Sequence, residues 1–377
     1  MFVCGFWFLA LVTDVLHYNR AKLTLAVFML VATLHLFCQA AYCSLEYDLT
    51  RRIDPVYVFT CLAVFPLYYL YVKTLTDPEG ITLRSLWVLL PAILSSLVSF
   101  VLYRFMPVEE TNAFVHQVLY RENGDYVFSM AGQLQKINTL FVKIALPCEI
   151  VPVFLYGFKR IRAYNAQVAE YYSNQEGKAI DVSRWFLFAF IITSALCAIF
   201  NAIGRHTFIQ PVEMLFIPSG LYVLMLFPLG FAGFRQEFMI TDLLRDESRE
   251  ESTFEAMPEN FSEKQFKQNL FLLIGKEEIY TKPNLRITDV AVRLGCSRNY
   301  LSRFLNQKLQ TNFSDFINKF RVEHAKRLLS LTSEMRITSA QIVDAAGFAS
   351  ESSFYRIFKS IEGKSPKAWK STHLQQN

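Results

Sequence analysis

The sequence predicts an all-α protein: a bundle of about seven transmembrane helices, followed by a C-terminal domain that contains two helix-turn-helix units. Two observations favour the membrane part: 53% of the 377 residues are hydrophobic, and only 19% are charged, against roughly 25% in soluble domains. A third observation divides the chain, because the long apolar stretches occupy the first 234 positions and then stop. The composition therefore excludes a disordered chain and a small disulfide-stapled domain, and it disfavours a single soluble globule.

Seven apolar stretches are candidate membrane spans. A spanning helix needs about 20 mainly apolar residues to cross roughly 30 Å of hydrocarbon. Six stretches reach that length: 22–45, 55–75, 83–103, 138–158, 185–204 and 213–234. The stretch 2–16 is shorter, but it lacks the positive region of a cleaved signal peptide and is counted as the first span. A transmembrane domain is therefore predicted over residues 1–235.

The charges of the connecting loops indicate which side the C-terminus occupies. With seven spans and the C-terminus inside, the inner loops carry nine Lys or Arg and the outer loops carry six. Cytoplasmic loops are enriched in these residues, so the C-terminal domain is expected in the cytoplasm. The long outer loop 104–136 has two open interpretations, a cap that faces a ligand or a connector with an interfacial helix.

Glu149 is the candidate ligand-binding residue of the membrane part. It lies mid-span between Pro147 and Pro152, and an ionisable side chain inside a membrane is costly and often functional. Its possible polar partners are Lys143, His35, Gln39 and Asn201. Two interpretations remain open: a polar pocket that binds a signal ligand, or an interhelical hydrogen bond that only holds the bundle together.

The charge pattern changes abruptly beyond the apolar stretches. Residues 235–261 carry 3 Lys or Arg against 8 Asp or Glu, and residues 262–377 carry 19 against 10. We therefore expect an acidic juxtamembrane linker over 236–261, either a solvated helix or a flexible segment. An amphipathic helix over 262–284 would pair two copies of the chain or pack on the basic domain after it, which covers 285–377. A basic domain favours an anionic partner, either nucleic acid or lipid headgroups.

A first helix-turn-helix unit is predicted from apolar spacing and turn residues. Four apolar residues from Ile287 to Leu294 share one helix face, Gly295 ends that helix, and Ser297 is a good N-cap for the next one. Hydrogen-bonding side chains then lie on the outer face of the second helix: Arg298, Asn299, Ser302, Arg303 and Asn306. Such side chains suit base edges and phosphates.

The same pattern repeats 52 residues later, so that Gly295 corresponds to Gly347. A long helix over about 314–329 joins the two copies. The second outer face is expected to carry Ser352, Ser353, Arg356 and Lys359. Two such units on one connecting helix would present two recognition helices to adjacent major grooves, roughly 34 Å apart along the duplex.

These motifs resemble the AraC-type DNA-binding domain. The resemblance covers about 85 residues and rests on NYLSRFLN and INKFRVEHAKRLL, followed by AAGFASESSFYRIFKSIEGKSPKAW. One departure is Val343, where the family has a small Ala beneath the recognition helix. The whole chain resembles the membrane-bound bacterial members of this family, although its membrane half matches them only in architecture.

The resemblance implies a role for each polar residue of the two outer faces. Base-contacting positions are expected at Asn299, Ser302 and Arg303 in the first unit and at Ser352, Ser353 and Arg356 in the second. Phosphate contacts are expected from Ser297, Arg298, Ser350 and Lys359. Each of these residues could instead belong to an ordinary solvated helix surface.

Two functional hypotheses arise from these features. The first is a one-component transcription regulator in the inner membrane of a bacterium, with promoter DNA, a signal ligand, the lipid bilayer, RNA polymerase and a second copy of the chain as partners. The second is a membrane receptor or scaffold whose helical domain binds a protein. Because HExxH, GxSxG and phosphate-loop motifs are absent, we expect no enzyme, no cofactor and no metal ion.

Overall fold

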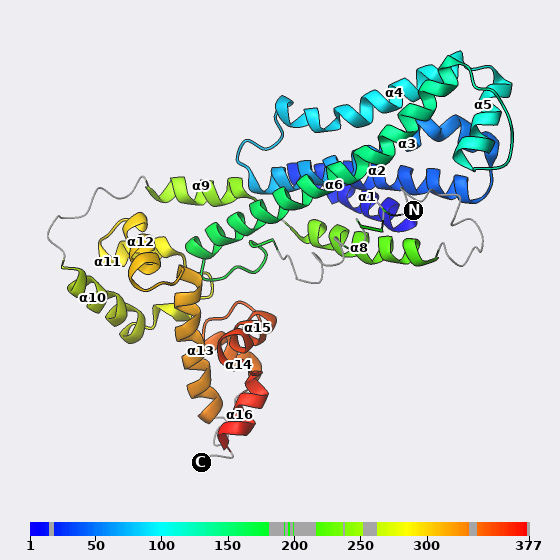
Figure 1. Ribbon diagram of the computed structural model, residues 1–377. Helices are drawn as coiled ribbons and strands as arrows, with labels where there is room; N and C mark the ends of the chain where they lie inside the picture. The colour runs from blue at the N-terminus through cyan, green and yellow to red at the C-terminus, as the bar shows by residue number, and fades with distance from the viewer. Residues whose placement is uncertain are drawn as a thin grey trace. The chain divides into compact units, whose positions relative to one another are not determined.

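The described part of the chain is helical in the computed structural model (Figure 1). The structure describes residues 1–14, 19–180, 192, 195, 196, 199, 216–236, 238–251, 262–331 and 338–374. Among these residues, extended backbone pairs only in an isolated antiparallel bridge between Tyr172 and Arg286. The chain divides into two compact units, Met1–Arg162 with Ile180–Ile240, and Ala163–Ala179 with Thr241–Asn377. The predicted all-α class is confirmed.

Within the described residues, four helices are long and apolar enough to cross a membrane. They are α2 (Arg20–Cys43), α3 (Tyr47–Thr76), Leu83–Phe105, which joins η2 (Leu83–Leu89) to α4 (Leu90–Phe105), and α6 (Met130–Tyr171). With 13 residues, α1 (Phe2–Asp14) is about 20 Å long, short of a roughly 30 Å hydrocarbon core. The helix α8 (Phe216–Arg235) covers residues 216–234 of the expected stretch 213–234. Apart from residues 192, 195, 196 and 199, the expected stretch 185–204 lies outside the described residues. The described residues thus contain four candidate spans and do not by themselves show the predicted seven.

The core of the first unit forms around α3. This helix packs against both α2 and α4, and 72% of its apolar window is buried, more than in the other three candidate spans. The helix α1 packs against α2 and α8. Trp7 of α1 contacts Phe227 of α8 at a ring-centroid distance of 5.5 Å. A Cβ at Gly230 would overlap the Trp7 indole, so only glycine permits this close approach.

The long loop after α4 folds back on the end of α2. It contains α5 (Val108–Phe114) and η3 (Val115–Leu119). The Tyr42 and Tyr120 rings stack at 4.2 Å between centroids, and each hydroxyl donates to a backbone carbonyl, Tyr42 to Leu119 at 2.7 Å and Tyr120 to Tyr42 at 2.8 Å. The loop therefore has a packed aromatic core of its own.

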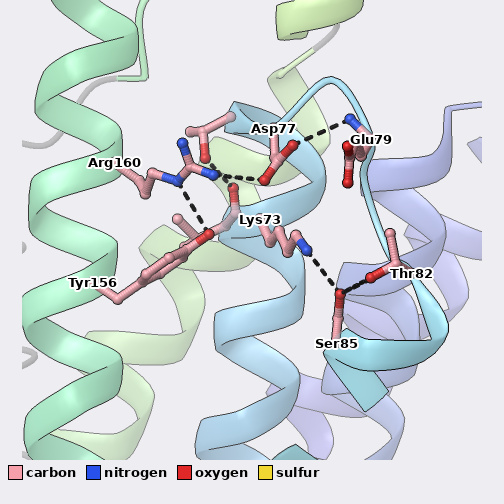
Figure 2. Close-up of polar contacts among 9 residues, drawn as sticks. Lys73, Asp77, Glu79, Thr82, Ser85, Tyr156 and Arg160 are labelled. Atoms are coloured by element: carbon pink, nitrogen blue, oxygen red, sulfur yellow. Dashed lines mark hydrogen bonds and ion pairs between the residues drawn. The ribbon is translucent and has the colours of Figure 1, made fainter. Parts of the chain in front are cut away.

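Polar contacts join the C-terminal end of α3 to α6 (Figure 2). Arg160 of α6 donates to the Asp77 carboxylate at 2.6 Å and to the Tyr156 hydroxyl at 3.1 Å. Lys73 of α3 donates to the Ser85 hydroxyl at 2.8 Å. Beyond these contacts α6 continues without interruption to Tyr171, and the boundary between the two units falls within this helix, after Arg162.

The second unit consists of short helices around a long connecting one. The helices are α9 (Ile240–Glu251), α10 (Glu263–Lys276), η6 (Ile279–Thr281), α11 (Ile287–Leu294), α12 (Arg298–Lys308), α13 (Phe313–Leu331), α14 (Ser339–Ala345), α15 (Glu351–Glu362) and α16 (Pro366–Leu374). In Figure 1, α13 runs from the α11–α12 pair to the α14–α15 pair. The amphipathic helix α10 buries Phe266 against the rings of Tyr300 and Phe304, both 4.9 Å away between centroids. It therefore packs on α12.

Arg321 of α13 is the largest fully buried side chain of the described residues. Its guanidinium donates to the carbonyls of Tyr280 at 2.8 Å and Lys282 at 2.6 Å, and to the Ser173 hydroxyl at 3.1 Å. Burial lowers the pKa of Arg321 to about 10, so the group stays charged at neutral pH. Arg321 thus ties the segment after α6 and the segment before α11 to the connecting helix.

Candidate nucleic-acid interface

The first pair of helices, α11 and α12, is joined by a tight turn. Gly295 adopts a left-handed φ of +65°, and the Cys296 N–H donates to the Ala291 carbonyl at 3.0 Å, which closes the end of α11. The Ser297 hydroxyl accepts the Tyr300 N–H at 3.2 Å and caps α12. Leu301, Phe304 and Leu305 are buried beneath it. Ser297 is thus the predicted N-cap, and the two helices form the predicted helix-turn-helix.

The polar residues of α12 lie on its outer side as the spacing predicts. Asn299 and Arg303 are exposed, and Arg298, Ser302 and Asn306 are half-buried. Any contact of these side chains with DNA stays a prediction, because the geometry shows only that they share one face.

The second pair, α14 and α15, repeats the arrangement. Gly347 has a φ of +79°, and the Ser350 hydroxyl accepts the Ser353 N–H at 3.1 Å as the cap of α15. Val343, the departure from the family pattern, is buried with Phe354 and Phe358 in the core against α13. The sequence repeat thus corresponds to a structural repeat.

The outer face of α15 carries three of its four predicted residues. Ser352, Arg356 and Lys359 are exposed, and Ser350 is half-buried at the cap. Ser353 is buried: its hydroxyl donates to the Ser350 carbonyl at 2.8 Å and accepts the Ser350 N–H at 3.2 Å. The expected outward orientation of Ser353 is therefore wrong, because the third residue of this helix completes a reciprocal cap.

Comparison with known proteins identifies this part of the chain. A family model described as "Helix-turn-helix domain" matches residues 290–372. An uncharacterized HTH-type transcriptional regulator of Staphylococcus aureus is 34% identical over 93 residues. The Msm operon regulatory protein of Streptococcus mutans is 28% identical over 94 residues. Residues 290–372 form a helix-turn-helix domain of the AraC type.

The similarity is confined to a part of each protein. It covers 25% of this chain in both cases, 12% of the Staphylococcus aureus protein and 32% of the Streptococcus mutans protein. This chain therefore spans less than a third of the length of either relative. No solved structure gives a significant match.

Gly347 lies close to the backbone of Thr281. A Cβ at this position would lie within 2.5 Å of the Thr281 Cα, and the left-handed φ adds strain for any other residue. We expect Gly347→Ala to destabilise the second helix-turn-helix unit by about 2–4 kcal/mol. Hydrogen exchange of α14 and α15 in the full chain measures this effect.

Gly363→Ala is the matched control for this prediction. Gly363 also has a left-handed φ, of +72°, but no atom lies within 4 Å of its added Cβ. The control variant therefore carries only the conformational cost of about 1–2 kcal/mol. Equal exchange in the two variants would show that the contact with Thr281 does not restrict residue 347.

Three of the predicted DNA-contacting residues are bound to carboxylates that belong, like them, to the second compact unit of the chain. Arg298 forms an ion pair with Glu247 of α9 at 2.8 Å. The Asn306 amide donates to Glu170 at 3.4 Å, and the Ser350 hydroxyl donates to Glu176 at 2.6 Å. The sequence did not indicate these contacts. Only Glu247 lies in a segment that the sequence singles out, the acidic linker 236–261 before the domain.

Among the described residues, no group of three or more His, Cys, Asp or Glu could hold a metal ion. Cys296, at the turn of the first unit, is buried, and burial raises the pKa of its thiol to about 12. This cysteine is therefore a packing residue rather than a reactive thiolate.

Proposed function

We propose that this chain is a membrane-embedded one-component transcription regulator, which binds specific promoter DNA through its AraC-type domain. The observation that carries the proposal is the pair of helix-turn-helix units with Arg303 and Arg356 exposed on corresponding outer faces. The regulators named among the relatives of this domain support the same activity.

The charge of the domain fits the chemistry of a duplex. Residues 262–377 carry 19 Lys or Arg against 10 Asp or Glu, and phosphate contacts supply much of the affinity for DNA and its dependence on salt. Arg303 and Arg356 would pair with guanine edges, each worth about 1–3 kcal/mol of discrimination. The domain therefore combines a general attraction to DNA with two candidate specificity residues.

The four candidate spans support a location in the bacterial inner membrane, with the AraC-type domain in the cytoplasm. A signal ligand would act on the bundle by shifting the balance between its conformations. Because α6 is one helix from Met130 to Tyr171 and belongs to both units, it offers a direct path for such a change. A second copy of the chain and RNA polymerase are the further partners that the proposal includes.

Crosslinking of the intact membrane-embedded protein to chromosomal DNA, with sequencing of the recovered fragments, tests the proposed function. We expect discrete peaks that disappear in an Arg303→Ala, Arg356→Ala variant. A map that lacks peaks, together with a purified full chain that binds no duplex, would contradict the proposal.

The alternative is a receptor or scaffold whose helical domain binds a protein. The similarity to transcription regulators and the basic charge favour DNA over this alternative. Competition with unrelated DNA separates the two hypotheses. Unrelated DNA should compete for a DNA-binding domain, and less effectively as the salt concentration rises. A domain that binds a protein should be unaffected by the duplex at any salt concentration.

Glu149 is the proposed contact for the signal ligand. Both of its carboxylate oxygens are buried, and neither has a hydrogen-bond partner among the described residues. It lies on α6 between Pro147 and Pro152, within the helix that extends into the second unit. An unpaired carboxyl group at this place is costly unless a ligand or proton satisfies it.

We expect Glu149→Gln to change the transcriptional response at least about fivefold, because one hydrogen bond to a buried carboxyl group is worth about 1 kcal/mol or more. Insertion into the membrane should be unaffected. The exposed Glu109 supplies the matched control, Glu109→Gln. An unaltered response in both variants would leave Glu149 with a structural role only. Reporter transcription and membrane fractionation measure the two effects.

A further inference from the structure

We infer that Glu170, Glu176 and Glu247 form an intrachain competitor of DNA, which holds the DNA-contacting side chains of the AraC-type domain in the DNA-free state. The inference rests on the proposed function and adds the regulation of the same surface. Its basis is that carboxylates of the second unit bind residues of both helix-turn-helix units.

The contact at the first unit centres on Arg298, a predicted phosphate contact. Its guanidinium pairs with Glu247 at 2.8 Å and lies 5.3 Å from the centroid of the Tyr171 ring. The two charged side chains are 19% and 18% exposed, so most of this ion pair is shielded from water. Asn306, on the same helix, donates to Glu170 at 3.4 Å. Both ends of the outer face of α12 are thus engaged.

The contact at the second unit centres on Ser350, also a predicted phosphate contact. Its hydroxyl donates to Glu176 at 2.6 Å. Next to this contact, Arg356 lines a cavity of about 180 Å³ together with Asn174 and Gln175. The segment after α6 therefore lies next to the cap residue Ser350 and next to Arg356 of α15.

Several hydrogen bonds to α13 hold this segment in place between the two helix-turn-helix units. Ser173 accepts hydrogen bonds at its carbonyl from Ser314 at 3.1 Å and Asn318 at 3.4 Å, and its hydroxyl accepts one from Arg321. Gln175 donates to the Ser314 hydroxyl at 2.9 Å. Since these anchors lie between Glu170 and Glu176, they present one carboxylate to α12 and the other to α15.

The chemistry of these contacts is that of a phosphate backbone. A carboxylate offers negative oxygens to an Arg guanidinium and a Ser hydroxyl, as a phosphate does. A side chain that is paired with Glu247 or Glu176 cannot donate the same hydrogen bonds to DNA. DNA must therefore displace three carboxylates before Arg298, Asn306 and Ser350 become available.

Through α6, Glu170 is connected along the chain to the first compact unit, Met1–Arg162 with Ile180–Ile240. Glu170 lies on α6, the helix that also carries Glu149. A shift or rotation of α6 caused by a signal would withdraw Glu170 and pull on the segment that holds Glu176. Release of the carboxylates would then raise the affinity for DNA, with no change within the helix-turn-helix units themselves.

Full-length protein in nanodiscs of phosphatidylethanolamine and phosphatidylglycerol is suitable for the test, with a random-sequence duplex of about 40 base pairs as the probe, long enough for two recognition helices one turn apart. The test variant is Glu170→Gln, Glu176→Gln, Glu247→Gln. The matched control is Glu263→Gln, Glu277→Gln, Glu323→Gln. It removes the same charge from ion pairs with Lys308, Arg293 and Lys326, none of which is a predicted DNA contact.

We expect the test variant to bind the duplex at least about tenfold more tightly than the control, since DNA no longer has to displace one shielded ion pair and two hydrogen bonds to carboxylates. The logarithm of its binding constant should also fall more steeply with the logarithm of salt, by about 0.9 for each phosphate contact released. This second readout separates released contacts from a loosened fold, which would not add phosphate contacts.

The remaining outcomes distinguish the two proposals. Equal binding by the test and control variants, with binding constants that fall equally as salt rises, would overturn the competition and leave the proposed function intact. No binding by any variant, even at low salt, would overturn the proposed function and the competition with it.

Discussion

Replacing Arg303 and Arg356 together by alanine is expected to lower the affinity for a specific promoter site by about 10²- to 10³-fold. Each arginine is exposed on the outer face of its helix, and each guanidinium–guanine pair is worth about 1–3 kcal/mol. Alanine is the best helix former, so α12 and α15 should keep their structure. Titration of a recovered promoter duplex with the full chain measures the loss.

The control must remove the same charge from another face of the domain. Arg293 and Arg327 meet this need, because both are exposed and pair with Glu277 and Glu278, away from the outer faces of α12 and α15. Arg293→Ala with Arg327→Ala should weaken binding to specific and random duplexes alike, by a modest factor. If the two double variants lose specific affinity equally, Arg303 and Arg356 act only through their charge.

The single variants refine this prediction. Arg303→Ala should relax the sequence preference at one half of the site, and Arg356→Ala at the other half about one helical turn away. Loss of preference at the same base pairs in both variants would mean that the two units do not occupy adjacent grooves.

The local features of the helix-turn-helix units were predictable from the sequence because each has a short-range cause. Gly295 and Gly347 end helices where a left-handed φ is needed, and both positions have it. Ser297 caps α12 as expected. Ser353 was misplaced for an equally local reason, since a serine three residues after a cap can turn inward and complete it.

The membrane part shows where apolar patterning is insufficient. Hydropathy located α2, α3, α4 and α6, but the helix of the stretch 138–158 runs through Pro147 and Pro152 and continues to Tyr171. Hydropathy records only the apolar window and gives no signal for the polar continuation of this helix. The consequence is large, because that continuation belongs to the second unit and carries Glu170.

The contacts on the DNA-facing side chains lay beyond sequence reasoning altogether. Glu170 and Asn306 are separated by 136 residues, and Ser350 and Glu176 by 174. A single sequence shows polar residues at these positions but contains no information about which carboxylate meets which donor. Arg321 belongs to the motif INKFRVEHAKRLL, which is recognisable in the sequence. Helical spacing alone did not indicate that this charged residue would be fully buried.

Arg321→Ala is expected to destabilise the AraC-type domain by about 3–5 kcal/mol. The change leaves the carbonyls of Tyr280 and Lys282 and the Ser173 hydroxyl without their buried donor, and each lost bond to a charged group costs about 1.5–3 kcal/mol. It also opens a cavity the size of the deleted side chain, which adds to the cost. Hydrogen exchange of η6, α11 and α13 in the full chain measures the effect.

Two further substitutions show why the guanidinium itself is required. Arg321→Lys keeps the positive charge but replaces a planar fork with a single ammonium group, which cannot reach the Tyr280 and Lys282 carbonyls and the Ser173 hydroxyl together. We therefore expect it to recover less than half of the lost stability. Arg327→Ala, on the exposed side of the same helix, should change exchange very little. If Arg321→Ala behaved like Arg327→Ala, Arg321 would not hold the segment after α6, and the hydrogen bonds with Ser314 and Asn318 would have to anchor the carboxylates at residues 170 and 176 without it.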